Sequence, residues 1–150
     1  MSIHKANIDV VAAVIKKNDL FLIANRSFKA SSRGIWEFPG GKVEENETFT
    51  SALIREIKEE LSLNIKVGNM IATIDLSKTD KNIYVHYYYA IIVSGQISLN
   101  VHSEFKWVPY PELKNFTYID GDRHILNYLR PKKFIGKGDC SNLTKYIYGI

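Results

Sequence analysis

Six glutamates lie within the seventeen residues from 44 to 60, and only two basic residues oppose them. The segment therefore carries a net charge of −4 in a chain whose overall charge is +4. Three of the six, Glu56, Glu59 and Glu60, are spaced i, i+3 and i+4, which places them on one face of a helix. Carboxylate oxygens are ligands that Mg²⁺ prefers, so this face could hold such an ion. A solvated acidic face would show the same spacing, because like-charge pairs cost a helix only about 0.2–0.5 kcal/mol each.

The residues just before this segment favour the first interpretation. Phe38-Pro39-Gly40-Gly41-Lys42 contains two glycines, which let a ligand approach the backbone closely, and a lysine, whose charge suits a phosphate. Potential metal ligands and phosphate donors are thus adjacent in sequence. Magnesium bound by carboxylates suits polyphosphate chemistry, in which the metal offsets charge and activates water.

These residues match a known signature. The segment from Gly41 to Leu63 resembles the 23-residue signature of the Nudix hydrolases, in which a glycine, four glutamates, an arginine and two aliphatic residues have fixed spacing. The glycine expected near its end is Ser62. The string WEFPGGKVE, residues 36–44, resembles the MutT-type branch, which includes diphosphatases of 8-oxo-dGTP and of (d)CTP. The positions in register are Gly41, Glu47, Arg55, Glu56, Ile57, Glu59, Glu60 and Leu63.

The resemblance implies a fold and a reaction. The fold would be the Nudix α/β/α sandwich of the α/β (α+β) class, with a mixed sheet between helices and a loop–helix–loop catalytic motif. The reaction would be attack of water on a nucleoside triphosphate, dependent on Mg²⁺ or Mn²⁺. It would release a nucleoside monophosphate and pyrophosphate, in the manner of a nucleotide-pool sanitation enzyme.

The resemblance also implies metal ligands. Glu59 and Glu60 would hold the ion, and Gly40 would offer its backbone carbonyl. Glu56 would either complete the metal shell or act as base on the attacking water. The family usually adds a carboxylate six residues before a tryptophan, but that position before Trp107 is a valine. Glu104 is the candidate replacement.

Two residues near these ligands have open roles. Arg55 is always charged and cannot be a base, so it would neutralise and aim a carboxylate, and Glu47 would suit a bidentate contact. The same pair could be only a structural clamp. His102 could transfer a proton, although a single histidine in a loop is more often solvated.

Six positions would bind substrate by resemblance: Arg26, Glu37, Phe38, Gly41, Lys42 and Asp122. Among them, Asp122 matches a position that reads the edge of the base, but it could instead cap the last helix. Arg26 could be a surface arginine, and Phe38 could belong to the core. Tyr88 could stack on a base, although core packing is the commoner role for a strand aromatic.

The elements that would position these residues follow from the hydrophobic pattern. Apolar and β-branched runs predict strands, and an apolar stripe at helical spacing, preceded by the N-cap Thr48, predicts the main helix. Ser62 follows it, where a left-handed residue often ends a helix. The predicted strands are 8–16, 20–25, 35–38, 65–76, 83–93 and 105–108, and the predicted helices are 48–61 and 120–129.

Length and composition agree with one domain. The chain has 150 residues, of which 45% are hydrophobic and 24% charged. We expect a Nudix domain over residues 1–130 and a basic extension over 131–150, which supplies most of the positive charge. The only cysteine, Cys140, cannot form an internal disulfide, so we expect a cytoplasmic protein. No apolar run is long enough for a membrane span.

The expected partner is a nucleotide, bound by a monomer or homodimer, without nucleic acid or membrane. Two alternative functions are compatible with the same sequence features. One is a nucleotide-binding sensor that kept the fold without catalysis. The other is an enzyme acting on RNA 5′ ends or on another nucleoside diphosphate conjugate, using the basic extension.

Overall fold

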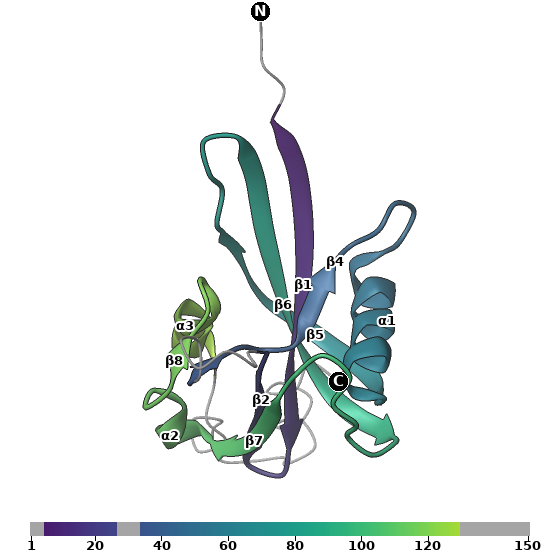
Figure 1. Cartoon of the computed structure of the whole chain (residues 1–150), viewed down its shortest axis with the longest axis vertical. Helices are drawn as coiled ribbons and strands as arrows, with labels where there is room; N and C mark the ends of the chain where they lie inside the picture. The colour runs from purple at the N-terminus through teal and green to yellow at the C-terminus, as the bar shows by residue number, and fades with distance from the viewer. Residues whose placement is uncertain (1–4, 27–33, 130–150) are drawn as a thin grey trace, which may run out of the picture.

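The computed structural model describes residues 5–26 and 34–129 of the chain (Figure 1). The predicted extension at 131–150, with Cys140, lies outside these residues. The strands are β1 (Ala6–Lys17), β2 (Leu20–Asn25), β3 (Ile35–Trp36), β4 (Gly40–Lys42), β5 (Asn64–Asp75), β6 (Lys81–Ser94), β7 (Glu104–Pro109) and β8 (Thr117–Tyr118). The helices are α1 (Phe49–Leu61), α2 (Tyr110–Leu113), α3 (Asp122–Ile125) and the 3₁₀ helix η2 (Leu126–Tyr128).

The main sheet is mixed, as the sequence predicted. Its strand order is β5-β6-β1-β2-β7, and β4 pairs with β1 beside this path. The β1–β6 pairing is parallel, whereas β1–β2, β2–β7, β5–β6 and β1–β4 are antiparallel. A second, small sheet consists of β3 and β8 in parallel.

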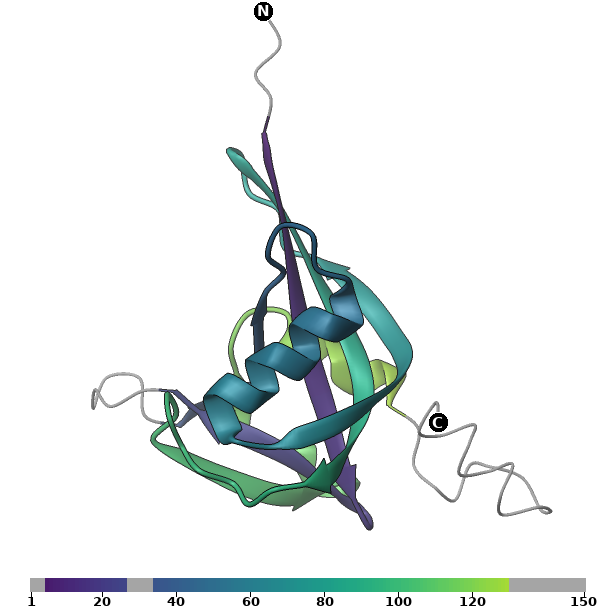
Figure 2. The same ribbon diagram turned by 90° about the vertical axis from the view of Figure 1, so that its right-hand side faces the viewer.

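β1 is apolar throughout its centre because both of its faces are covered. Val11, Ala13 and Ile15 pack with the buried side chains of α1, whereas Ala12 and Val14 belong to the cluster on the opposite face. Figures 1 and 2 show α1 against one face and α2 and α3 on the other side. Alternating residues of one strand thus enter two separate cores, which confirms the predicted three-layer arrangement.

The helix α1 begins and ends where the sequence predicted. Thr48 accepts a hydrogen bond from the Ser51 backbone, and the Ser51 hydroxyl accepts one from the Thr48 backbone, so the two residues form a capping box. The buried stripe of Ala52, Leu53, Ile57 and Leu61 faces the sheet. No helix in the described part of the chain is long and apolar enough to cross a membrane.

The structure corrects one prediction of local structure and adds one short strand that was not predicted. The helix expected at 120–129 is shorter, because Gly121 has φ 89° and helical turns begin only at Asp122, and a 3₁₀ turn follows the first four residues. The strand expected at 35–38 ends at Trp36, before Pro39, and Gly40 begins a further short strand, β4, in which it pairs with Ala12. The proline lies outside that ladder, so its missing N–H is not needed there.

The left-handed conformation of Ser62 at the end of α1 can be tested for backbone strain. Ser62 has φ 59° and ψ 30°, the left-handed conformation, and its N–H bonds to the Lys58 carbonyl. Ser62→Gly and Ser62→Ala both lose the contact of the hydroxyl with Asn100, but only alanine retains the strain. We expect the glycine variant to exceed the alanine variant in free energy of unfolding by about 1 kcal/mol, measured by chemical denaturation. Equal stabilities would contradict this account.

Candidate functional site

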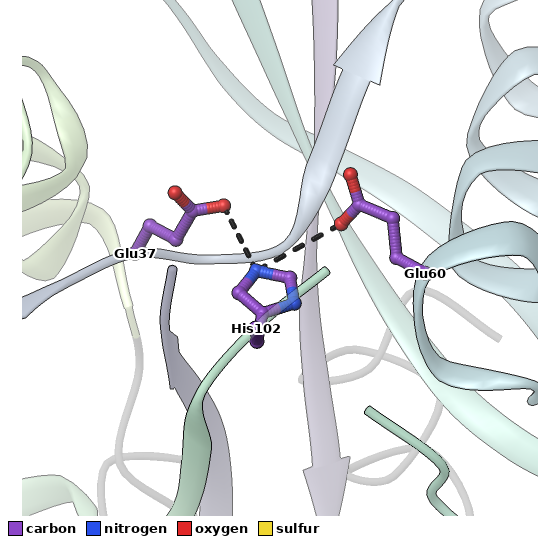
Figure 3. A group of neighbouring side chains, drawn as sticks. All are labelled: Glu37, Glu60 and His102. Atoms are coloured by element: carbon purple, nitrogen blue, oxygen red, sulfur yellow. Dashed lines mark hydrogen bonds and ion pairs between the residues drawn. The ribbon is translucent and has the colours of Figure 1, made fainter. Parts of the chain in front are cut away.

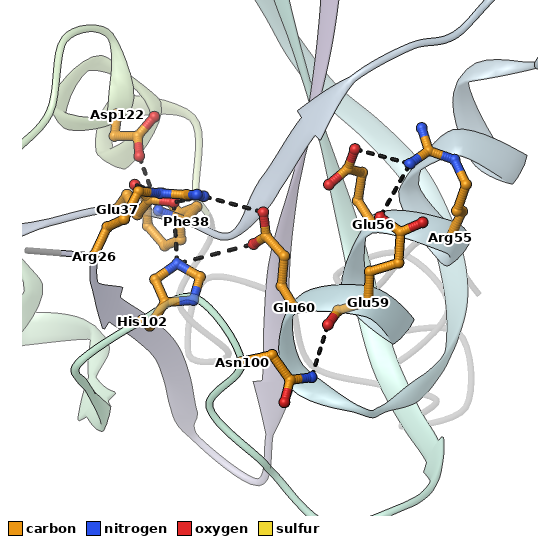
Figure 4. A network of polar contacts seen from close by, with 10 residues as sticks. All are labelled: Arg26, Glu37, Phe38, Arg55, Glu56, Glu59, Glu60, Asn100, His102 and Asp122. Carbon is orange, nitrogen blue, oxygen red and sulfur yellow. Dashed lines mark hydrogen bonds and ion pairs between the residues drawn. The ribbon is translucent and has the colours of Figure 1, made fainter.

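The acidic residues of α1 separate into two polar clusters (Figure 4). In the first, Arg55 holds Glu47 through two parallel hydrogen bonds, Nε–Oε2 at 2.7 Å and Nη2–Oε1 at 2.8 Å. The same guanidinium donates to Glu56 at 2.9 Å, to Glu59 at 3.3 Å and to the Lys42 carbonyl at 3.1 Å. The bidentate contact expected between Arg55 and Glu47 is therefore present.

This contact has an electrostatic consequence for Glu47. Hydrogen bonds from Arg55, followed by one from the Glu44 backbone N–H, lower the pKa of Glu47 to about 2. The carboxylate thus stays ionised and tied to the arginine at any physiological pH. Its position fixes the turn before α1 relative to the helix itself.

Gly41 brings this cluster into contact with β4. A Cβ on Gly41 would lie 2.3 Å from Cδ of Glu56 and within 2.6 Å of both its oxygens. The Glu56 carboxylate therefore packs directly on the glycine backbone. Gly40 is more severely restricted, because its Cβ would lie 1.9 Å from the Val11 carbonyl oxygen. A side chain at Gly40 would therefore meet backbone, whereas one at Gly41 would meet only the end of the Glu56 side chain.

In the second cluster, Glu60 points away from Glu56 and Glu59 (Figure 4). Arg26 Nη2 donates to Glu60 Oε1 at 3.0 Å, and the same guanidinium donates to both oxygens of Glu37 at 3.0 and 3.2 Å. His102 Nε2 lies 3.2 Å from Glu37 Oε2 and 3.9 Å from Glu60 Oε2 (Figure 3). The predicted trio of glutamates thus does not gather at one point.

The pKa values of the two carboxylates of this cluster shift in opposite directions. Burial raises the pKa of Glu60, and the charge and hydrogen bond of Arg26 only partly offset this effect. Burial also opposes ionisation of Glu37, but hydrogen bonds from His102 and Arg26 outweigh it and lower its pKa. Glu60 Oε2 is buried and has no hydrogen-bond partner, so this carboxylate lacks part of the solvation it would have in water.

Within residues 5–26 and 34–129, one group of three side chains offers closely spaced metal-ligand atoms: Glu37, Glu60 and His102, within 4.8 Å of one another. The Arg26 guanidinium already contacts both of its carboxylates and supplies positive charge there. A divalent ion at Glu37 would therefore compete with Arg26. The unpartnered Glu60 oxygen is the atom of this group that a cation would satisfy.

The loop before β7 departs from expectation. His102 was expected to be solvated, but it is 2% exposed, because its ring inserts between the two carboxylates. Glu104 begins β7 opposite Asn25 and is exposed, and it is not part of this group. Histidine, rather than a carboxylate, is what this loop contributes to the buried cluster.

A cavity of about 610 Å³ adjoins the second cluster. Its lining includes five of the six predicted substrate-binding residues and Gly40: Arg26, Glu37, Phe38, Gly40, Gly41 and Asp122. Lys42 is exposed and is not part of the lining. Phe38 is also a core residue, stacked on Tyr118 with ring centroids 5.9 Å apart. Tyr88 packs with the α1 core and does not line the cavity.

Asp122 lies at the inner wall of this cavity and is 5% exposed. Its Oδ2 accepts from the Phe38 backbone N–H at 2.8 Å, and Tyr87 Oη bonds to Oδ1 at 2.5 Å. It makes no capping bond, since Gly121 is the N-cap of α3. No local sequence pattern indicates the role of Tyr87, because its pairing with Asp122 joins positions 35 residues apart. Burial raises the pKa of Asp122 to about 7, although both hydrogen bonds oppose this shift.

Known proteins match the whole of this region. The NUDIX domain family model matches residues 6–129. The CTP pyrophosphohydrolase of Escherichia coli K12 is 31% identical over 119 residues, covering 79% of this chain and 88% of that protein. The 8-oxo-dGTP diphosphatase of Buchnera aphidicola subsp. Schizaphis graminum is 32% identical over 125 residues, covering 83% and 94%. The solution structure of the E. coli ORF135 protein has a TM-score of 0.77 at 28% identity, covering 90% and 96%.

The raised pKa of Asp122 predicts a pH-dependent stability. Asparagine mimics the protonated acid, since its amide can donate to Tyr87 and accept from Phe38. The pKa of Asp122 is higher in the folded state than in the unfolded state. The protonated Asp122 therefore contributes its full stabilisation of the fold at low pH, and this contribution is lost as the pH rises toward 7. Relative to Asp122→Asn, we expect the free energy of unfolding of the wild type to fall by on the order of 2 kcal/mol between pH 5 and 7. Urea denaturation of both proteins measures it, and parallel pH profiles would contradict it.

Proposed function

Because this chain belongs to the NUDIX family, we propose that it hydrolyses a nucleoside triphosphate, of the 8-oxo-dGTP or (d)CTP type, to a nucleoside monophosphate and pyrophosphate. The names of the relatives reported above support this substrate class. The observation that carries the proposal is the contact between the cavity and α1. Gly41, which lines the cavity, lies directly against the Glu56 carboxylate of the acidic helix.

The cavity would hold the nucleoside. Its volume lies in the range of small-molecule sites, roughly 300–1,000 Å³. Asp122 can accept hydrogen bonds from a base when ionised, or donate one when protonated, and its pKa near 7 makes both forms accessible. Arg26 and Glu37 line the cavity, and Arg26 also contacts Glu60 of α1, so the phosphates of a bound nucleotide would meet the cation near these residues.

The acidic helix would hold a divalent cation, Mg²⁺ or Mn²⁺. Glu56, Glu59 and Glu60 would offer carboxylate oxygens and Gly40 a backbone carbonyl, which are donors that such an ion prefers. Glu60 Oε2 supports this most directly, because it is buried without a hydrogen-bond donor. Glu56 and Glu59 are held by Arg55 in the other cluster and would have to turn toward Glu60 to share one ion. When bound, such an ion would offset the charge of the polyphosphate and lower the pKa of a coordinated water.

The remaining roles belong to side chains of the chain itself. Arg55 fixes Glu56 and Glu59 through hydrogen bonds while Glu47 anchors the arginine. This arrangement lets Arg55 orient the carboxylates without leaving their charges uncompensated. Glu56 either completes the ligand set or accepts the proton of the attacking water, because its carboxylate lies against the Gly41 wall of the cavity.

A substrate screen combined with one substitution tests the assignment. Canonical and oxidised triphosphates, with nucleoside diphosphate conjugates and 5′-triphosphorylated RNA for comparison, are assayed for pyrophosphate release with Mg²⁺. We expect release from a free triphosphate, and a fall in kcat on the order of 10³-fold in Glu60→Gln, which keeps the shape but removes the charge. Glu45→Gln, at an exposed glutamate of the preceding turn, is the matched control. Unchanged turnover in Glu60→Gln would refute the proposed role of this carboxylate.

We expect alanine at Gly40 to reduce stability and alanine at Gly41 to reduce activity. An added Cβ at Gly40 meets the Val11 backbone, which cannot move without breaking the β1–β4 pairing. We expect Gly40→Ala to unfold at markedly lower denaturant concentration, with a loss of about 3 kcal/mol or more. An added Cβ at Gly41 meets only the flexible end of Glu56. Gly41→Ala should therefore remain folded by circular dichroism while kcat falls at least tenfold, and the reverse order would contradict this structural account.

A further inference from the structure

The segment that carries His102 is fixed to both halves of the site. On one side, the Ser98 and Asn100 backbone N–H groups donate to the carbonyls of Leu61 and Glu60 at 2.9 and 3.1 Å. The Asn100 side chain donates to the Glu59 carbonyl at 2.7 Å. These are carbonyls of the last turn of α1, which have no partner within the helix.

On the other side, the same segment is tied to the end of β2. The backbone N–H and hydroxyl of Ser103 both bond to the Asn25 carbonyl, at 2.7 and 3.0 Å. Asn25 immediately precedes Arg26 in the chain. His102 thus lies between two anchors, one on the helix that carries Glu60 and one beside the arginine of the cavity.

The His102 imidazole can donate a hydrogen bond to only one of the two carboxylates, Glu37 or Glu60. An ionised Glu37 only accepts hydrogen bonds, so His102 Nε2 carries the hydrogen in the 3.2 Å bond to Glu37 Oε2. That single hydrogen cannot also bond Glu60 Oε2, which is 3.9 Å away. Glu37 is thereby held by two donors, Arg26 and His102, whereas one Glu60 oxygen keeps no donor.

We propose that His102 is a positioning residue that holds the Glu37 carboxylate in place for the nucleotide while leaving the second Glu60 oxygen available to the cation. This inference rests on the proposed function. His102 acts through Glu37 rather than on the reacting atoms, so its loss should weaken nucleotide binding and leave the chemical step and the affinity for metal unchanged. A histidine that ligates metal would give a different pattern.

The test compares three histidine variants. His102→Gln retains an amide donor near the Nε2 position, His102→Leu retains bulk without a donor, and His86→Leu is the matched control. His86 is also buried and bonded to a carboxylate, Asp9, at 2.8 Å, but it lies outside the cavity. Calorimetry measures Kd for the α,β-methylene analogues of CTP and of 8-oxo-dGTP, and for Mn²⁺ alone, and steady-state assays give kcat and KM.

We expect His102→Leu to raise the analogue Kd and the KM by roughly tenfold to a hundredfold, with kcat and Mn²⁺ affinity little changed. His102→Gln should recover most of the lost affinity, and His86→Leu should leave it unaltered. In a double-mutant cycle with Glu37→Gln, the two losses in analogue affinity should be strongly non-additive. If His102→Leu does not fold, His102→Asn replaces it, because its amide occupies the Nδ1 position and cannot reach Glu37.

Three results would overturn the inference: additive losses in the cycle, a lowered kcat at unchanged KM, or a loss of Mn²⁺ affinity. The last would make His102 a metal ligand. Failure of the proposed function is distinguishable from these. A wild-type protein that binds an analogue but hydrolyses no triphosphate would overturn hydrolysis, while the analogue Kd values would still decide the role of His102. Absence of analogue binding by the wild type would overturn both.

Discussion

The site depends on a steric constraint at two adjacent residues without side chains. Gly40 lies against the Val11 carbonyl of β1, and Gly41 lies against the Glu56 carboxylate of α1. A side chain at Gly40 would force β4 away from the central strand, whereas one at Gly41 would displace the Glu56 carboxylate. This close packing places the Glu56 carboxylate of α1 directly behind the Gly41 backbone that lines the cavity. A nucleoside in the cavity and a cation on the helix would then lie within the reach of one polyphosphate.

Charge compensation divides the acidic helix into two parts with different properties. Arg55 serves the outer part, where it ties Glu47, Glu56 and Glu59 together near solvent. Arg26 serves the inner part, where Glu60 is buried and its pKa is raised because water is excluded. The outer carboxylates are held in position, whereas the inner one is incompletely solvated, so an additional cation has the most to stabilise there.

The cavity shows the same effect of burial on a second acid. Asp122 accepts two hydrogen bonds, yet desolvation still raises its pKa to about 7. The bonds come from Tyr87 on the central sheet and from the Phe38 backbone, so the carboxyl is held rigidly. A group that can donate or accept at neutral pH, fixed in a largely apolar wall, suits recognition of the polar edge of a base.

The sequence by itself determined the features that depend on local interactions. The N-cap Thr48 and the apolar stripe define α1, and the apolar run of β1 marks a buried strand. The fixed spacing of the glutamates, Arg55 and Gly41 identified the family and the bidentate partner Glu47. These signals are readable because the residues concerned interact within a turn, an element or a short loop.

Only the tertiary structure decided the direction of Glu60, the burial of His102 and the strand conformation of Gly40. Glu60 meets Arg26 across 34 positions and His102 meets Glu37 across 65, so no local pattern indicates either pairing. Proline and glycine locally favour a turn, but pairing with β1 makes a strand of the glycines. Long-range packing sets which carboxylates lose water, and the loss of water, rather than their spacing, distinguishes the buried glutamate from the solvated ones.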